Sequence, residues 1–65
     1  MVTINGEKKA IEGKSISVVL EEMNFDSARV VVERNEEIVS KDTYGETLLQ
    51  AGDVVEVISF VGGGW

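Results

Sequence analysis

Residues 54–61, with the sequence VVEVISFV, form the most apolar stretch of the chain and decide which folds are open to it. All of these residues except Glu56 and Ser59 are β-branched or aromatic, a composition typical of a β-strand. Alternate side chains of a strand face opposite sides of a sheet, so the odd-numbered residues would share one side and the even-numbered ones the other. Both sides of this strand would therefore present large apolar groups.

Two explanations fit a strand that is apolar on both sides. In the first, the irregular segment around residues 40–50 folds over Ile58 and Phe60, so that both sides are covered. In the second, one side is left open for a partner protein. The sequence predicts a single helix, which can cover only one face of a sheet. The other face would be covered by the irregular segment or by a partner, so both explanations remain open.

Residues 1–13 predict a β-hairpin at the other end of the chain. Val2 and Ile4 alternate with polar residues, and the Asn-Gly dipeptide that follows favours a tight turn because both of its residues tolerate positive φ. The second strand is expected over residues 8–12, with Ile11 turned inward.

The apolar period changes to that of a helix over residues 15–25. Four apolar side chains fall at positions i, i+3, i+4 and i+7 and would form one stripe: Ile16, Val19, Leu20 and Met23. Glu21 and Glu22 would face water. Either Ser15 or Ser17 can cap the N-terminus of this helix.

A second β-branched segment predicts a strand that begins near Ala28 and turns around Asn35. Val30 and Val32 are its expected inward pair. The segment that follows is irregular, with a helical turn expected near residues 42–44.

Within the same irregular segment, Leu48 and Leu49 are expected to anchor the core, and a turn is expected at residues 51–53. The predicted order is hairpin, helix, strand, loop and final strand. This order indicates an α+β fold of the β-grasp type, a mixed sheet of four to five strands packed on one helix, with the first and last strands parallel at its centre. We expect residues 1–61 to form this domain and residues 62–65 a flexible glycine-rich tail.

The composition excludes most of the usual catalytic chemistry. With 65 residues the chain forms one domain, and with neither cysteine nor histidine it has no disulfide, no thiol nucleophile, no histidine base and no ordinary zinc site.

No apolar run approaches the roughly 20 residues that span a bilayer, and the N-terminus lacks the order of a signal peptide, so we expect a soluble, cytoplasmic protein. The net charge of −6 favours solubility and basic partners and disfavours nucleic acid and anionic membranes.

The chain resembles the ThiS family, the sulfur carrier proteins of thiamine biosynthesis, over its whole length. The matching stretches are INGE at 4–7, EGKSI at 12–16, VVVERNEEIVSKDTY at 30–44, AGDVVEV at 51–57 and FVGGG at 60–64. A glycine run alone is weak evidence, because such runs are common in linkers. Joined to a β-grasp pattern of this length, it is much more specific.

The resemblance implies a protein co-substrate rather than an enzyme. In the family, an E1-like (ThiF-like) enzyme uses ATP to adenylate the terminal glycine carboxylate, a persulfide supplies sulfur, and the resulting thiocarboxylate donates it to a ThiG-like thiazole synthase. Gly64, or Gly63 if a longer piece is removed, would be the acceptor, and Gly62 part of the arm. No stably bound cofactor or metal is implied.

The resemblance also favours a docking surface for the apolar residues of the final strand, namely Ile58, Phe60 and Val61. Acidic residues near that strand, such as Asp53 and Glu56, are candidates to meet basic groups on the partners. For the glutamate pairs Glu21/Glu22 and Glu36/Glu37, solvated faces are expected rather than acid–base chemistry.

Trp65 departs from the family pattern. While it remains attached, the terminal carboxylate belongs to a bulky residue that does not suit a glycine-shaped channel, so adenylation is not expected. Three explanations stay open: a precursor trimmed by a peptidase such as a JAMM-type protease, an artificial addition, or a shared fold with a different activity. A carrier for another sulfur pathway and a ubiquitin-like modifier or binding module are the alternative functions.

Overall fold

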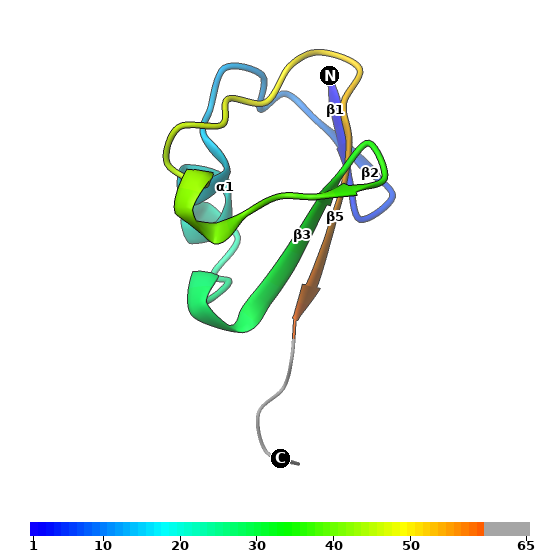
Figure 1. The fold of residues 1–65 in the computed structure, drawn as a ribbon. Coiled ribbons are helices and arrows are strands. Elements are labelled where there is room, and N and C mark those ends of the chain that lie inside the picture. The colour runs from blue at the N-terminus through cyan, green and yellow to red at the C-terminus, as the bar shows by residue number, and fades with distance from the viewer. Residues whose placement is uncertain (60–65) are drawn as a thin grey trace.

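The computed structural model describes residues 1–59, and it contains the predicted mixed sheet and single α-helix (Figure 1). The elements are β1 (Val2–Ile4), β2 (Glu7–Lys9), α1 (Ile16–Glu22), η1 (Ser27–Arg29), β3 (Val30–Arg34), β4 (Glu37–Ile38), η2 (Lys41–Thr43) and β5 (Val54–Ser59). The five strands lie in the order β2-β1-β5-β3-β4. The last strand is central, parallel to β1 and antiparallel to β3, which confirms the β-grasp prediction.

The N-terminal hairpin forms with the predicted turn, but its second strand lies earlier than expected. Asn5 and Gly6 both have positive φ, of 50° and 84°. Strand β2 ends at Lys9 instead of continuing through residue 12, because the chain then leaves β1 and pairs with Leu49: the Gly13 N–H donates to the Leu49 carbonyl at 2.8 Å. Ile11 is nevertheless buried, as predicted.

Helix α1 begins as predicted and ends earlier than predicted. The Ser15 side chain caps it by accepting a hydrogen bond from the Val18 N–H at 3.2 Å, which decides between the two candidate serines. The helix stops at Glu22 because Asn24 adopts a φ of 62°, outside the helical region, and the Phe25 N–H returns to the Leu20 carbonyl at 2.8 Å.

Strand β3 begins two residues later than predicted. A short 3₁₀ turn, η1, precedes it, and the Asp26 side chain caps that turn by accepting from the Ala28 N–H at 2.9 Å. Val30 and Val32 are buried, as predicted. The hairpin to β4 turns at Asn35 and Glu36, which both have positive φ.

The irregular segment packs on the helix side of the sheet. The Ser17 N–H donates to the Tyr44 carbonyl at 3.1 Å, and Leu49 is only 2% exposed. The prediction for Leu48 is wrong: its side chain is 53% exposed, because it faces away from its neighbour Leu49 in an extended bridge to Ser15. Ile58 remains 45% exposed, so this segment does not cover it, which favours the second explanation for the apolar strand. Phe60, the other residue named in the first explanation, lies outside the described residues.

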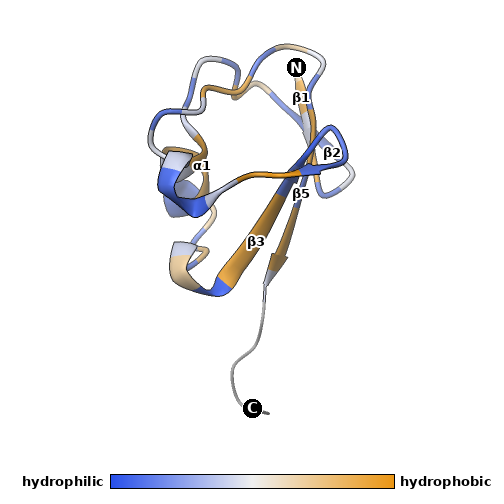
Figure 2. Ribbon diagram, viewed as in Figure 1, coloured by the Kyte–Doolittle hydropathy of each residue, from blue (hydrophilic) through white to orange (hydrophobic). Residues whose placement is uncertain are grey.

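The hydrophobic core lies between α1, the irregular segment and one face of the sheet. Strands β3 and β5 contribute most of the hydrophobic colour of the sheet in Figure 2. The buried apolar side chains are Val2, Ile4, Ile11, Ile16, Val19, Leu20, Val30, Val32, Tyr44, Leu49, Val55 and Val57. No helix within residues 1–59 is long and apolar enough to span a membrane.

Candidate functional site

Most of the predicted site lies outside the described residues. This holds for the docking residues Phe60 and Val61, for the glycines at 62–64, for Trp65 and for the predicted domain boundary after residue 61. Of the predicted site residues, the structure describes Ile58. It also describes β5, the strand that leads to the others.

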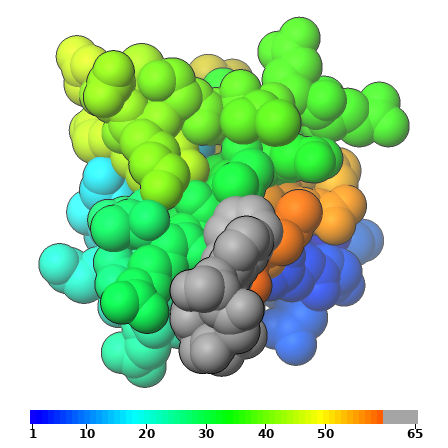
Figure 3. All heavy atoms as spheres, turned by 60° about the horizontal axis from the view of Figure 1, so that its bottom comes forward, coloured from blue at the N-terminus to red at the C-terminus, as the bar shows by residue number. Residues whose placement is uncertain are grey.

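Strand β5 is held on both sides, but for different lengths. It pairs with β3 from Val55 to Ser59, whereas β1 accompanies it only as far as Ile4. Where β1 ends, the Asn5 side chain continues the pairing, because the Val57 N–H donates to Asn5 Oδ1 at 2.8 Å. Figure 3 looks towards the end at which β5 finishes, with the atoms of β5 in orange beside the N-terminal hairpin in blue.

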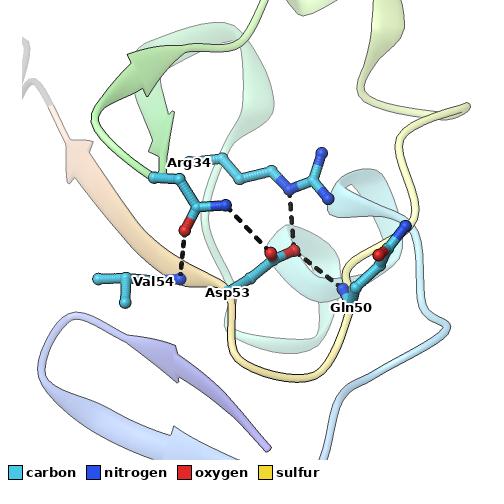
Figure 4. Close-up of polar contacts among 5 residues, drawn as sticks. Arg34, Gln50, Asp53 and Val54 are labelled. Atoms are coloured by element: carbon cyan, nitrogen blue, oxygen red, sulfur yellow. Dashed lines mark hydrogen bonds and ion pairs between the residues drawn. The ribbon is translucent and has the colours of Figure 1, made fainter.

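The start of β5 is fixed by a hydrogen-bond network around Asp53 (Figure 4). The Asp53 carboxylate accepts from Arg34 Nε at 2.8 Å, from Asn35 Nδ2 at 3.1 Å and from the Gln50 N–H at 2.9 Å. Asn35 Oδ1 in turn accepts from the Val54 N–H at 2.9 Å. The network joins the β3–β4 turn to the first residue of β5, so this end of the strand is anchored to its neighbour.

Asp53 faces inward and is only 7% exposed. Burial acts to raise the pKa of Asp53, but the hydrogen bonds from Gln50, Asn35 and Arg34, together with the charge of Arg34, outweigh it and hold the pKa below its usual value. The carboxylate therefore serves the fold. The expectation that Asp53 is available to meet a partner is wrong, because its oxygens are occupied by these three donors.

The outer face of β5 is open. Val54 and Ile58 are 51% and 45% exposed, and Glu56 between them is also exposed. Across the strand pair, Val31 lies opposite Ile58 and Glu33 lies opposite Glu56. We call these five residues, Val31, Glu33, Val54, Glu56 and Ile58, the outer patch.

The outer patch contains one predicted docking residue, Ile58, and one neighbour that was not predicted. Val54 lies on the same face as Ile58, as the alternation of side chains along the strand predicts. Glu33 belongs to a strand distant in sequence, and only the β3–β5 register brings it next to Glu56. No pocket opens in residues 1–59, so the described part of the candidate site is an exposed surface and the end of a strand.

The fold and this surface define a small ubiquitin-like β-grasp protein, with a central final strand that leads into a glycine-rich terminus. The model of the ThiS family matches residues 2–64, almost the whole chain. The protein belongs to the ThiS family.

Individual relatives agree with this assignment. The sulfur carrier protein ThiS of Thermus thermophilus is 42% identical over 64 residues, covering 98% of this chain and 100% of the relative. The crystal structure of a thiamine biosynthesis protein (ThiS) from Geobacter metallireducens superimposes with a TM-score of 0.76 at 28% identity, over 97% of each chain.

A second kind of relative is much longer than this chain. The thiazole synthase of Paramagnetospirillum magneticum is 39% identical over 64 residues, which cover 97% of this chain but 20% of that protein. The chain thus spans about a fifth of the length of the thiazole synthases that it matches. In these relatives, a ThiS-like segment is part of a polypeptide named for thiazole synthesis.

Proposed function

We propose that this protein is a sulfur carrier whose C-terminal glycine carboxylate is adenylated and converted to a thiocarboxylate, which donates its sulfur to the thiazole ring of thiamine. The observation that carries the proposal is the match to the ThiS family over residues 2–64, including the terminal FVGGG. The relative from Thermus thermophilus, named a sulfur carrier, and the thiazole synthase relatives support it from two directions.

The chemistry assigned to the terminus needs a small and accessible carboxylate. Glycine has no Cβ, so its backbone can approach a ligand closely in a narrow site. Residues 61–64, if fully extended, reach about 13 Å at roughly 3.3 Å per residue. An arm of this length takes the carboxylate of Gly64, or of Gly63 after a longer trimming, into a partner's cleft while the domain stays outside.

The folded domain fixes the point from which that arm extends. Strand β5 is anchored at its start by the Asp53 network and paired with β3 as far as Ser59. A partner that binds the outer patch around Ile58, together with Phe60 and Val61, therefore determines where the terminus points. Side chains of the carrier take no part in the reaction, and the partner enzyme binds and uses ATP.

Three partners follow from this role. A ThiF-like E1 enzyme adenylates the terminus, a ThiG-like thiazole synthase receives the sulfur, and a JAMM-type protease removes Trp65 from a precursor. Removal comes first, because an adenylated Trp65 would place the activated group one residue too far from the domain and add an indole to a channel shaped for glycine.

The test compares the chain ending at Gly64 with the full chain ending at Trp65. Each is incubated with the E1-like enzyme of the same genome, ATP, a persulfide donor and a dithiol reductant, and its intact mass is recorded. The persulfide displaces AMP from the adenylate, and the dithiol reduces the resulting acyl disulfide to the thiocarboxylate. We expect the shorter chain to gain the mass difference between sulfur and oxygen and the full chain to remain unchanged. A shorter chain that gains no such mass, or one that forms a lysine-linked conjugate instead, would contradict the proposal.

A further inference from the structure

We propose that Glu33 and Glu56 together receive a cationic side chain, most suitably arginine, of the thiazole synthase that covers the outer patch. This inference rests on the proposed function, since it names the chemistry of one partner surface. It concerns two residues of different strands that the fold brings side by side.

The two glutamates form a close cross-strand pair. Glu33 and Glu56 are directly opposite each other across β3 and β5, and the Cβ atoms of such a pair are roughly 5 Å apart. Both lie on the outer face, because the buried Val32 and Val57, their respective neighbours, face the core. The two carboxylates therefore project from the same point of the open face.

Neither glutamate of the pair has an ion-pair partner within residues 1–59. None of the ion pairs and side-chain hydrogen bonds formed within residues 1–59 involves the carboxylate of Glu33 or Glu56. Like charges directly opposite each other destabilise a sheet. In the free protein, this arrangement therefore works against the β3–β5 pairing that holds the final strand.

Glu56 has apolar neighbours on both sides along its strand. It lies between Val54 and Ile58 on the same face of β5, and both of these side chains are about half exposed. A surface that covers both apolar residues must also cover Glu56. Burying an unpaired carboxylate is costly, so the covering surface has to supply a cation.

The paired carboxylates favour a particular cation, and the relatives indicate a particular partner. A guanidinium group offers five N–H donors in a planar fork and can bind two carboxylates at once, which a compact ammonium does less well. The thiazole synthase is the indicated partner because in relatives a segment like this chain shares its polypeptide. Such a link keeps the two surfaces at high effective concentration.

The experiment measures binding of the chain ending at Gly64 to the thiazole synthase of the same genome by isothermal titration calorimetry. We expect Glu33→Gln and Glu56→Gln each to weaken binding, on the order of tenfold, while raising the urea midpoint of the free protein. The matched control is Glu21→Gln, which removes the same charge from an exposed position on α1 and should change the affinity far less.

The opposite signs of the two effects distinguish a binding role from a structural one. If Glu33→Gln and Glu56→Gln bind the synthase like Glu21→Gln, or if the unaltered chain does not bind it, the inference is overturned. It is also overturned if these variants impair only adenylation by the E1-like enzyme, which would assign the pair to that partner.

A further variant, Ile58→Ser, separates this inference from the function on which it rests. If Ile58→Ser weakens binding and the glutamate variants do not, the docking surface stands and the cation site is overturned. If neither Ile58→Ser nor the glutamate variants weaken binding, the synthase does not dock on the outer patch, and the cation site is overturned as well. The mass test of sulfur transfer decides the carrier function independently of both.

Discussion

Asp53 shows how a single residue can fix the start of the final strand, β5. Within residues 1–59 it is the one charged residue that is buried. Three donors satisfy its carboxylate: Arg34 at the end of β3, Asn35 in the β3–β4 turn and the Gln50 N–H in the preceding loop. A carboxylate of this kind is stabilising while ionised, because its pKa is lower in the folded protein than in the unfolded chain.

The stability of the protein should therefore decrease in acid, in part through Asp53. The unfolded chain takes up a proton on Asp53 near pH 4, whereas the folded protein does so at lower pH, so this contribution is present above about pH 4 and is lost as the pH falls through the lowered pKa. We expect Asp53→Asn to cost about 1–3 kcal/mol at pH 7 and to reduce the loss of stability as the pH falls below about 4.

Urea unfolding at several pH values measures both effects. The control is again Glu21→Gln, which removes an exposed carboxylate that forms no ion pair within residues 1–59. The assignment would be wrong if Asp53→Asn retained the full acid dependence of the unaltered protein. The sequence offered Asp53 as a partner contact, and only the tertiary contacts of its carboxylate show that it faces inward.

Among the secondary-structure elements of residues 1–59, α1 is the one α-helix, and it is short. It has seven residues, and helices of this length are marginal by themselves, so they depend on packing and capping. Its apolar stripe meets the core through Ile16, Val19 and Leu20. At its N-terminus, the Ser15 hydroxyl satisfies the Val18 N–H, one of the donors that a helix leaves without an internal partner.

Loss of that cap should destabilise the protein measurably. We expect Ser15→Ala to lower the free energy of unfolding by about 1 kcal/mol. Ser17 is exposed and does not cap the helix, so Ser17→Ala should change stability by less than about 0.5 kcal/mol. Equal effects of the two substitutions in urea unfolding would refute the assignment of the cap.

The kinds of element were predictable, and their ends were less so. Alternation of apolar residues, the Asn-Gly turn and the helical stripe are local properties of the chain. The end of β2 depends on Leu49, which is forty positions beyond Lys9. Leu49 is buried and Leu48 is exposed because their side chains point in opposite directions from the extended bridge to Ser15. Neither this difference nor the end of β2 can be recognised in a local sequence pattern.

At the scale of the whole molecule, the apolar residues of the sheet are buried on one face and exposed on the other. Its inner face contains Ile4 and Val55, which are almost completely buried, while its outer face leaves Val54 and Ile58 about half exposed. A domain of this size has a total stability of only about 3–10 kcal/mol, at roughly 0.05–0.15 kcal/mol per residue. In a domain with so little stability to spare, apolar side chains that stay outside the core therefore indicate a binding surface.

Truncation on the two faces should have different consequences. We expect Ile4→Ala to cost about 2–5 kcal/mol through lost burial and a cavity, enough to unfold much of the population. Ile58→Ala should cost less than about 1 kcal/mol, because the side chain is already 45% exposed. Urea unfolding of both variants checks this, and a loss at Ile58 as large as that at Ile4 would show that the outer patch belongs to the core.

The sequence by itself determined the order and kind of the elements, the central apolar strand, the glycine-rich terminus and the family resemblance that the comparisons confirm. These properties depend on local periodicity and on short motifs. Only the tertiary structure decided that Asp53 faces inward, that the irregular segment packs on the helix, and that Glu33 stands opposite Glu56. The physical reason is that register and burial are set by contacts between residues far apart in the chain, and a periodic pattern shows which residues share a face without showing what covers it.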